Sequence, residues 1–267
     1  MKQIVLIFFI FLVLVSCGPY QKALKSDDPN VKVSMIDTLM KKEKYSKSID
    51  LFEQIIPLYR GTDSAAPMAI KYAKALYGDR RYLSSAYQFE RFVTSHPLDN
   101  NVEEAIFLGA KSYYHMSPVY SKDQSETNTA LIKLQDYINA YPEGKYNEEA
   151  NVLVAELREK LDRKAYEIAK QYHHRGGIYI KAAIAGFENF IIDHPGSNYL
   201  DDAHYYLFES QYIYAVNSFE NLIPERLALA KKYYNNFARR FPNSEYKDDA
   251  QEIMAEIEKF ESENLSN

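Results

Sequence analysis

A ten-residue phrase, FPNSEYKDDA at residues 241–250, recurs in altered form at three other places in this chain. In every copy a proline is preceded by large apolar residues eight and five positions earlier, and is followed by two acidic residues and an alanine at positions six to eight. The four prolines are Pro97, Pro142, Pro195 and Pro242, at intervals of 45, 53 and 47 residues. Such repetition predicts a fold made by stacking copies of one supersecondary unit.

Each copy has the features of a corner between two helices. Residues three apart lie on one helix face, and a proline disfavours the α conformation of the residue before it. A serine two positions after the proline, as at Ser197 and Ser244, can cap the next helix. The acidic pair then falls in the early turns of that helix, where the positive end of the helix dipole favours carboxylates. The helix ends that this pattern predicts are His96, Tyr141, His194 and Phe241.

The repeat resembles the tetratricopeptide repeat, which also has a small residue about twelve positions before a helix-ending proline, although its period of about 34 residues is shorter. A first copy at residues 31–59 lacks the final aromatic-proline pair, and Pro57 should shorten its second helix. Residues 147–175 contain no proline or glycine and keep a helical period, which predicts one long helix stopped by Gly176 and Gly177.

The predicted fold is therefore all-α, a tetratricopeptide-like solenoid of about five helix pairs with a capping helix from Tyr246 to about Glu263. We expect N-terminal repeats at residues 31–146. The long connecting helix and the C-terminal repeats should occupy residues 147–267. No separate catalytic domain fits between the repeats.

The N-terminus has the features of a lipoprotein signal peptide at residues 1–16. A short positive end precedes an apolar run at residues 4–15, which is too short to span a bilayer as a helix. The run ends in LVSC, a sequence similar to a bacterial lipobox, so we expect Cys17, the sole cysteine, to carry lipid. The alternative is an ordinary signal peptide with an incidental cysteine.

Residues 17–30 are predicted to form a lipidated flexible linker, because they combine proline and glycine with no apolar period. Gly18 follows the lipidated position. By resemblance to lipoproteins of diderm bacteria, the lack of aspartate there favours the outer membrane, and the absence of an acidic cluster just after it favours the periplasmic face.

Charge and motifs exclude several classes of function. A net charge of -5 and a pI of about 5.8 argue against nucleic-acid binding, which needs a basic face. The chain has no phosphate loop, nucleophile elbow or zinc-binding HExxH motif. His173 and His174 are adjacent, so they point to different parts of a helix surface. We expect no catalytic residue, no cofactor and no metal site, and hence no enzyme.

The lipobox and the five long repeats together resemble the BamD family, tetratricopeptide-repeat lipoproteins of the β-barrel assembly machinery, especially in its Bacteroidetes-like form. The resemblance extends over about residues 30–260. Its most specific part is residues 157–199, LREKLDRKAYEIAKQYHHRGGIYIKAAIAGFENFIIDHPGSNY. There a long helix, an Arg-Gly stop and an aromatic helix ending in His-Pro follow in the family's order.

The resemblance implies a non-catalytic scaffold that is held by lipid at the outer membrane. N-terminal repeats would receive C-terminal signals of unfolded outer membrane proteins. C-terminal repeats would dock on a BamA-type barrel subunit, beside other subunits of the complex. By position, Arg175 and Tyr179 correspond to the docking region, although Arg175 could equally serve only to complement the helix dipole. Gly186 stands where some relatives carry a basic residue just ahead of the first aromatic residue of that helix, a departure that puts that one contact in doubt.

Two other classes of protein remain open. One is another envelope repeat lipoprotein, such as a cell-division or peptidoglycan-associated adaptor. The other is a SusD-like glycan-binding lipoprotein, which should be longer and should use tryptophan for sugar stacking, whereas this chain has no tryptophan.

Overall fold

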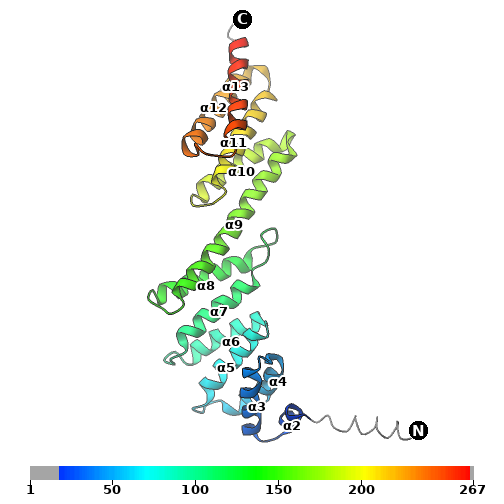
Figure 1. Cartoon of the computed structure of the whole chain (residues 1–267), viewed down its shortest axis with the longest axis vertical. Coiled ribbons are helices and arrows are strands. Elements are labelled where there is room, and N and C mark those ends of the chain that lie inside the picture. The colour runs from blue at the N-terminus through cyan, green and yellow to red at the C-terminus, as the bar shows by residue number, and fades with distance from the viewer. Residues whose placement is uncertain (1–17, 265–267) are drawn as a thin grey trace, which may run out of the picture. The chain divides into compact units, whose positions relative to one another are not determined.

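The computed structural model describes residues 18–264, which fold into α-helices and short 3-10 helices without a β-strand (Figure 1). Cys17 and the predicted signal peptide lie outside the described residues. The α-helices are α2 (Pro19–Lys25), α3 (Pro29–Lys41), α4 (Tyr45–Ile55), α5 (Ala65–Gly78), α6 (Tyr82–Ser95), α7 (Val102–Met116), α8 (Ser125–Ala140), α9 (Asn147–Arg175), α10 (Ile180–Asp193), α11 (Leu200–Val216), α12 (Ile223–Arg240) and α13 (Lys247–Asn264). The 3-10 helices are η1 (Ile56–Tyr59), η2 (Gly177–Tyr179) and η3 (Glu220–Leu222).

The helices form the predicted repeat architecture. The five pairs are α3 with α4, α5 with α6, α7 with α8, α9 with α10, and α11 with α12, and α13 packs on the last pair. The all-α helical-repeat fold, the single long helix α9 and the C-terminal capping helix are thus confirmed. η1 begins at Ile56 and contains Pro57, so α4 stops early, as the proline predicts.

The described chain divides into two compact units. One contains residues up to 118 together with 124–154, and the other contains residues 119–123 together with those from 155 onward. The division between residues 154 and 155 falls inside α9. The loop 119–123, which connects α7 and α8, belongs to the second unit.

The proline corners end the helices at the predicted residues. His96, Tyr141, His194 and Phe241 are the C-terminal caps of α6, α8, α10 and α12. Each cap still donates its backbone N–H to the carbonyl four residues earlier, and the proline that follows has no N–H with which to continue the helix. The apolar residues ahead of the prolines fill the interior between helices. Those exposed by at most 2% are Phe89, Phe92, Leu134, Tyr137, Phe187, Phe190 and Phe237.

The corner serines were predicted to cap the helices that follow, but their hydroxyls accept backbone N–H groups in the turn before each helix. The hydroxyl oxygen of Ser197 accepts the N–H of Tyr199 at 3.2 Å, and that of Ser244 accepts the N–H of Tyr246 at 3.1 Å. These amides precede the first helical residues Leu200 and Lys247. The serines therefore shape the turn, and are not themselves the N-caps.

The flexible-linker prediction was wrong for residues 19–25, which form helix α2, and for Pro29 and Asn30, which begin α3. Ala23 is 1% exposed in a core shared with α3 and α4, and the phenol of Tyr20 donates a 2.7 Å hydrogen bond to Asp50. The physical signal was present in the sequence. Pro19 suits the first position of a helix, and Tyr20, Ala23 and Leu24 recur on one helical face.

Candidate functional site

The predicted partner-binding residues Arg175 and Tyr179 flank a tight turn between α9 and α10. Arg175 is the last residue of α9, and Gly176 and Gly177 follow with φ values of 59° and 52°. Glycine adopts this left-handed region without the steric cost that a Cβ atom imposes. The chain then makes the single turn η2 and enters α10. The two glycines therefore place Tyr179 back beside the end of α9.

The structure brings Arg175 and Tyr179 together. The guanidinium carbon of Arg175 lies 5.4 Å from the centroid of the Tyr179 ring, within cation–π range. The same ring stacks on Tyr172 at 6.2 Å with an interplanar angle of 22°. Tyr179 is 40% exposed and its neighbour Ile178 is 88% exposed. The turn therefore presents a cation, an aromatic ring and an aliphatic side chain on the surface of the second unit.

A groove runs along α9 toward this turn. It has a volume of about 640 Å³, and we call it the α9 groove. The loop before α8 and one face of α9 line it. Its residues are Tyr120, Ser121, Lys164, Glu167, Ile168, Lys170, Gln171, His174 and Arg175. Residues at 164, 168, 171 and 175 share a helical face, so α9 supplies most of the groove from a single stripe.

The electrostatics of the α9 groove are positive. Lys164 donates a 2.6 Å hydrogen bond from Nζ to the carbonyl of Lys122, and Lys170 Nζ lies 5.3 Å from the Tyr166 ring and 4.9 Å from the Tyr206 ring. Within residues 18–264, no carboxylate oxygen lies within 4 Å of the cationic nitrogens of Lys164, Lys170 or Arg175. The groove therefore contains three cations that have no carboxylate partner.

Glu167 is the one carboxylate that lines the groove, and its nearest cation is Arg163, at 4.0 Å. The guanidinium of Arg163 also stacks at 4.3 Å on the ring of Tyr120. Sequence reasoning missed Lys164 and Lys170. The spacing of eleven residues between Lys164 and Arg175 places both on one helical face and could have identified Lys164, whereas Lys170 lies about 140° round the helix from Arg175 and had no such signal.

The packing around Gly186 leaves no room for a basic side chain at that position. It lies on α10, and a Cβ atom built there would come within 3.0 Å of the Cβ of Ala169 on α9. The position faces the close packing between the two helices. A long cationic side chain has no room there in the observed arrangement.

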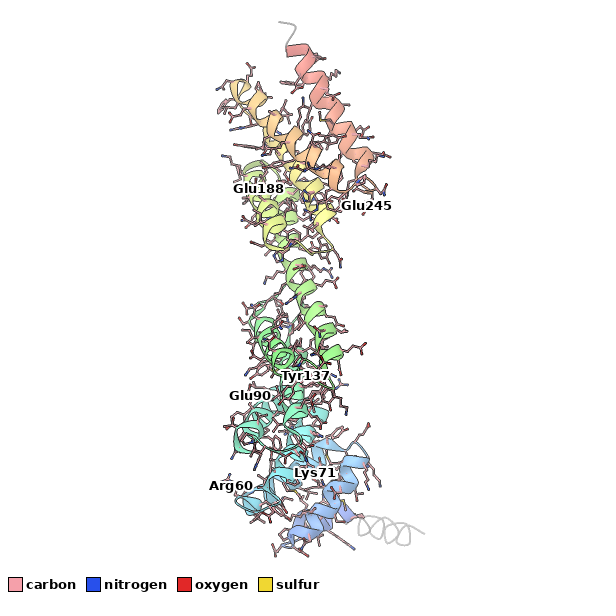
Figure 2. All side chains as sticks on the ribbon, turned by 90° about the vertical axis from the view of Figure 1, so that its left-hand side faces the viewer. Arg60, Lys71, Glu90, Tyr137, Glu188 and Glu245 are labelled. Atoms are coloured by element: carbon pink, nitrogen blue, oxygen red, sulfur yellow. The ribbon has the colours of Figure 1, made fainter. Side chains whose placement is uncertain are left out.

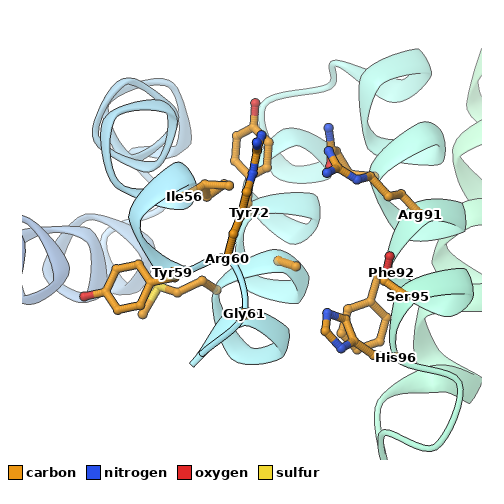
Figure 3. A pocket seen from close by; sticks show the side chains of 13 residues that line it. Ile56, Tyr59, Arg60, Gly61, Tyr72, Arg91, Phe92, Ser95 and His96 are labelled. Atoms are coloured by element: carbon orange, nitrogen blue, oxygen red, sulfur yellow. The ribbon is translucent and has the colours of Figure 1, made fainter. Parts of the chain in front are cut away.

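A second groove, of about 240 Å³, lies in the N-terminal unit. Figure 3 shows Tyr59, Arg60 and Tyr72 on one side of it, with Arg91 and His96 on the opposite side. Most of the remaining lining is apolar, including the side chains of α5 and α6. Two arginines beside aromatic and aliphatic walls suit a peptide that carries both an apolar side chain and a carboxylate.

The described residues contain neither a metal-binding cluster nor a membrane-spanning helix. No group of three or more His, Cys, Asp or Glu side chains there could hold a metal ion. His173 instead contacts the hydroxyl of Ser210 at 2.8 Å and the carboxylate of Glu209 at 3.3 Å. None of the helices of residues 18–264 is long and apolar enough to cross a membrane.

Comparison with known families identifies the chain. The family described as outer membrane lipoprotein, YfiO, matches residues 33–185 and 177–260. The chain belongs to this family. Arg175 lies in the first matched stretch, and Tyr179 lies where the two stretches overlap. An outer membrane association follows from the family.

Three curated relatives are named outer membrane protein assembly factor BamD. The protein of Rickettsia prowazekii is 25% identical, over 78% of this chain and 78% of its own length. That of Caulobacter vibrioides is 22% identical, over 65% of this chain and 56% of its own length. That of Xylella fastidiosa is 21% identical, over 72% of this chain and 70% of its own length. These names describe assembly factors and not enzymes, so the chain is a non-catalytic member of the family.

Proposed function

We propose that this outer membrane lipoprotein is a non-catalytic assembly factor for outer membrane β-barrel proteins, anchored at the periplasmic face by lipid on Cys17. Membership of the family and the shared name of its relatives support this role. The geometric observation that carries the proposal is the exposed turn at Arg175 and Tyr179, beside the cationic α9 groove. A scaffold needs such a surface, whereas it needs no buried reactive group.

In this proposal the second unit docks on a BamA-type barrel subunit through that turn. Ile178 and Tyr179 would supply apolar and aromatic contact, and Arg175 would supply a charged hydrogen-bond donor. Aromatic residues and arginine are enriched among the residues that dominate binding energy at protein interfaces. Further subunits of the assembly complex would contact other faces of the repeats.

The first unit would receive unfolded outer membrane proteins in the groove between Arg60 and Arg91. Cross-linking of a labelled segment from an unfolded barrel protein to the full chain tests this assignment. Replacing both arginines by glutamine should reduce the cross-link while leaving recovery of the barrel subunit unchanged. An unchanged cross-link would remove the groove from the proposal.

Affinity purification of the tagged protein from its own membranes tests the function as a whole. A BamA-type barrel subunit should co-purify, and the double variant Arg175→Ala, Tyr179→Ala should lose most of it. Arg158→Ala, an exposed substitution on α9 outside the groove, is the matched control. Recovery of peptidoglycan-associated or division proteins without a barrel subunit would instead support the adaptor alternative. Membrane retention of a Cys17→Ala variant after salt washing would contradict the lipid anchor.

A further inference from the structure

We infer that the α9 groove binds a short extended protein segment that carries at least two carboxylates. The inference rests on the proposed docking function, because it assigns the chemistry of the segment that docks there. It starts from three cations that no carboxylate of the described chain neutralises, namely Lys164, Lys170 and Arg175.

The charge of the groove is opposite in sign to the net charge of the chain. The full sequence has a net charge of -5, whereas the groove is lined by three cations and one carboxylate. That carboxylate, Glu167, is already within ion-pair distance of Arg163. An acidic ligand is therefore repelled by the net charge of the chain and attracted to the cations of the groove, which favours docking there.

The cations of the groove have unused hydrogen-bonding capacity. A lysine ammonium has three donors. Lys164 uses one of them on the carbonyl of Lys122, and Lys170 lies over two aromatic rings without a hydrogen bond to either ring. Carboxylates are the strongest acceptors that a protein segment offers, because charge-assisted bonds are shorter and stronger than neutral ones.

The length of the stripe sets the length of the segment. Lys164 and Arg175 stand eleven positions apart on α9, which corresponds to about 16 Å at 1.5 Å per residue. An extended chain advances about 3.3 Å per residue, so about five residues span that distance. Carboxylates near both ends of such a segment would reach the two terminal cations. Lys170 lies between them along the helix axis, but about 120° round the helix from Lys164, so it lines one edge of the groove and would reach the segment from the side.

The middle of the groove favours a protein segment over a small anion. Ile168 is 46% exposed and lines the groove with the ring of Tyr120. An aliphatic side chain between two acidic residues would cover this apolar surface. A headgroup of an anionic lipid supplies charge without that central apolar contact, so it matches the groove less completely.

The test uses the detergent-solubilised, lipidated full chain and a fluorescein-labelled peptide. The peptide has two aspartates separated by about four valine and threonine residues, which is the spacing set by the stripe. Its control has asparagine in place of both aspartates. The aspartate peptide should bind with an affinity that falls as salt is raised, and the asparagine peptide should bind much more weakly.

Variants then locate the peptide. Lys164→Gln and Lys170→Gln should each lower its affinity by about two- to fivefold, the range for one partly exposed ion pair. Arg158→Gln should leave the affinity unchanged, because this exposed α9 residue does not line the groove. Equal binding of the two peptides, or no loss in Lys170→Gln, would overturn the inference. Binding of phosphatidylglycerol vesicles that displaces the peptide completely would assign the groove to lipid and would also overturn it.

Recovery of the barrel subunit in the same preparation separates this inference from the proposed function. If the wild-type chain recovers the subunit but does not bind the aspartate peptide, the inference fails and the function stands. If the peptide binds as expected but no subunit is recovered, the docking function fails.

Discussion

The phenol of Tyr137 in α8 donates a 3.0 Å hydrogen bond to Glu103 in α7, the first residue of the acidic pair at positions six and seven after Pro97. The same carboxylate accepts the backbone N–H of Lys145, in the next corner, at 2.7 Å. Figure 2 labels Tyr137 within its unit. In the second unit, Asp201 accepts the hydroxyl of Ser244 at 2.7 Å. An acidic residue of one corner therefore accepts hydrogen bonds from residues in or next to the following corner and links the two repeats.

Removal of Glu103 should destabilise the N-terminal unit. Glu103→Ala deletes two hydrogen bonds and leaves a buried phenol without its acceptor, which should lower the free energy of unfolding by about 1–3 kcal/mol. Urea denaturation measures this change. The control is Glu143→Ala, an exposed acid in the corner of Pro142 to which Glu103 bonds, which should stay within about 0.5 kcal/mol of the wild type. Equal losses in the two variants would show that Glu103 acts only as a surface charge.

Alkaline pH should destabilise the C-terminal unit through Tyr166 and Tyr246, which both donate to Asp202, at 3.0 and 2.8 Å. Burial, and then the Asp202 carboxylate, raises the pKa of both phenols well above the ordinary value. The folded pKa therefore exceeds the unfolded one. The stability linked to the protonated phenols is complete below about pH 10 and is lost as pH rises above it. Melting temperatures across this range should fall less steeply in Tyr166→Phe than in the wild type, and parallel curves would contradict the linkage.

The local features of the fold were predictable because they depend on neighbours in sequence. A proline acts on the residue before it, so the four helix ends at His96, Tyr141, His194 and Phe241 could be located from the repeats alone. The long helix α9 followed in the same way from residues 147–175, which lack proline and glycine. The turn that joins Arg175 to Tyr179 was indicated by its two glycines.

Contacts between repeats were not predictable, because they depend on how far one helix pair is shifted against the next. The acidic pairs were assigned to the helix dipole, and that local reason is compatible with their place in the first turns of α7 and α11. The bonds from Glu103 to Tyr137 and from Asp202 to Tyr246 span 34 and 44 residues. Likewise, Lys170 became part of a site only when the loop at Tyr120 was placed against α9.

Helix α2 provides a test of the segment that was predicted as a linker. Ala23→Asp would bury an unpaired carboxylate against the core of α3 and α4, and should lower the free energy of unfolding by about 2–4 kcal/mol. Gln21→Asp lies on the exposed face of the same helix and should be nearly neutral. Chemical denaturation compares the two variants. If Ala23→Asp is also neutral, the segment does not pack on the repeats in solution.

The packing at Gly186 predicts that a basic residue introduced at this position will destabilise the C-terminal unit. Gly186→Arg must displace Ala169, whose Cβ would be 3.0 Å from the new Cβ atom. Overpacking of this kind costs about 1–3 kcal/mol. Ala185→Arg, at the adjacent exposed position of α10, should change the melting temperature little. A melting temperature of Gly186→Arg equal to that of Ala185→Arg would mean that α9 and α10 separate easily at this point.

The stability of the C-terminal unit should depend on His204 in mildly acidic solution. Its Nε2 atom is buried without a hydrogen-bond partner, and its ring lies 5.4 Å from that of Phe241. Burial, and then the charge of Arg240, lowers the pKa of His204 to about 4. The unfolded chain binds a proton at this position below about pH 6.5, whereas the folded chain does so only near pH 4. Stability is therefore lost as pH falls through this window.

His204→Phe keeps a planar ring of similar size and removes the titrating group. The variant should gain stability relative to the wild type as pH is lowered from about 6.5 toward 4. Carboxylates that titrate in the same range are common to both proteins, so they largely cancel in the difference between the two unfolding curves. A difference that stays constant across the window would show that the proton binds His204 equally well in the folded and unfolded chains. In that case the ring must be able to turn its Nε2 atom to water without unfolding of the unit.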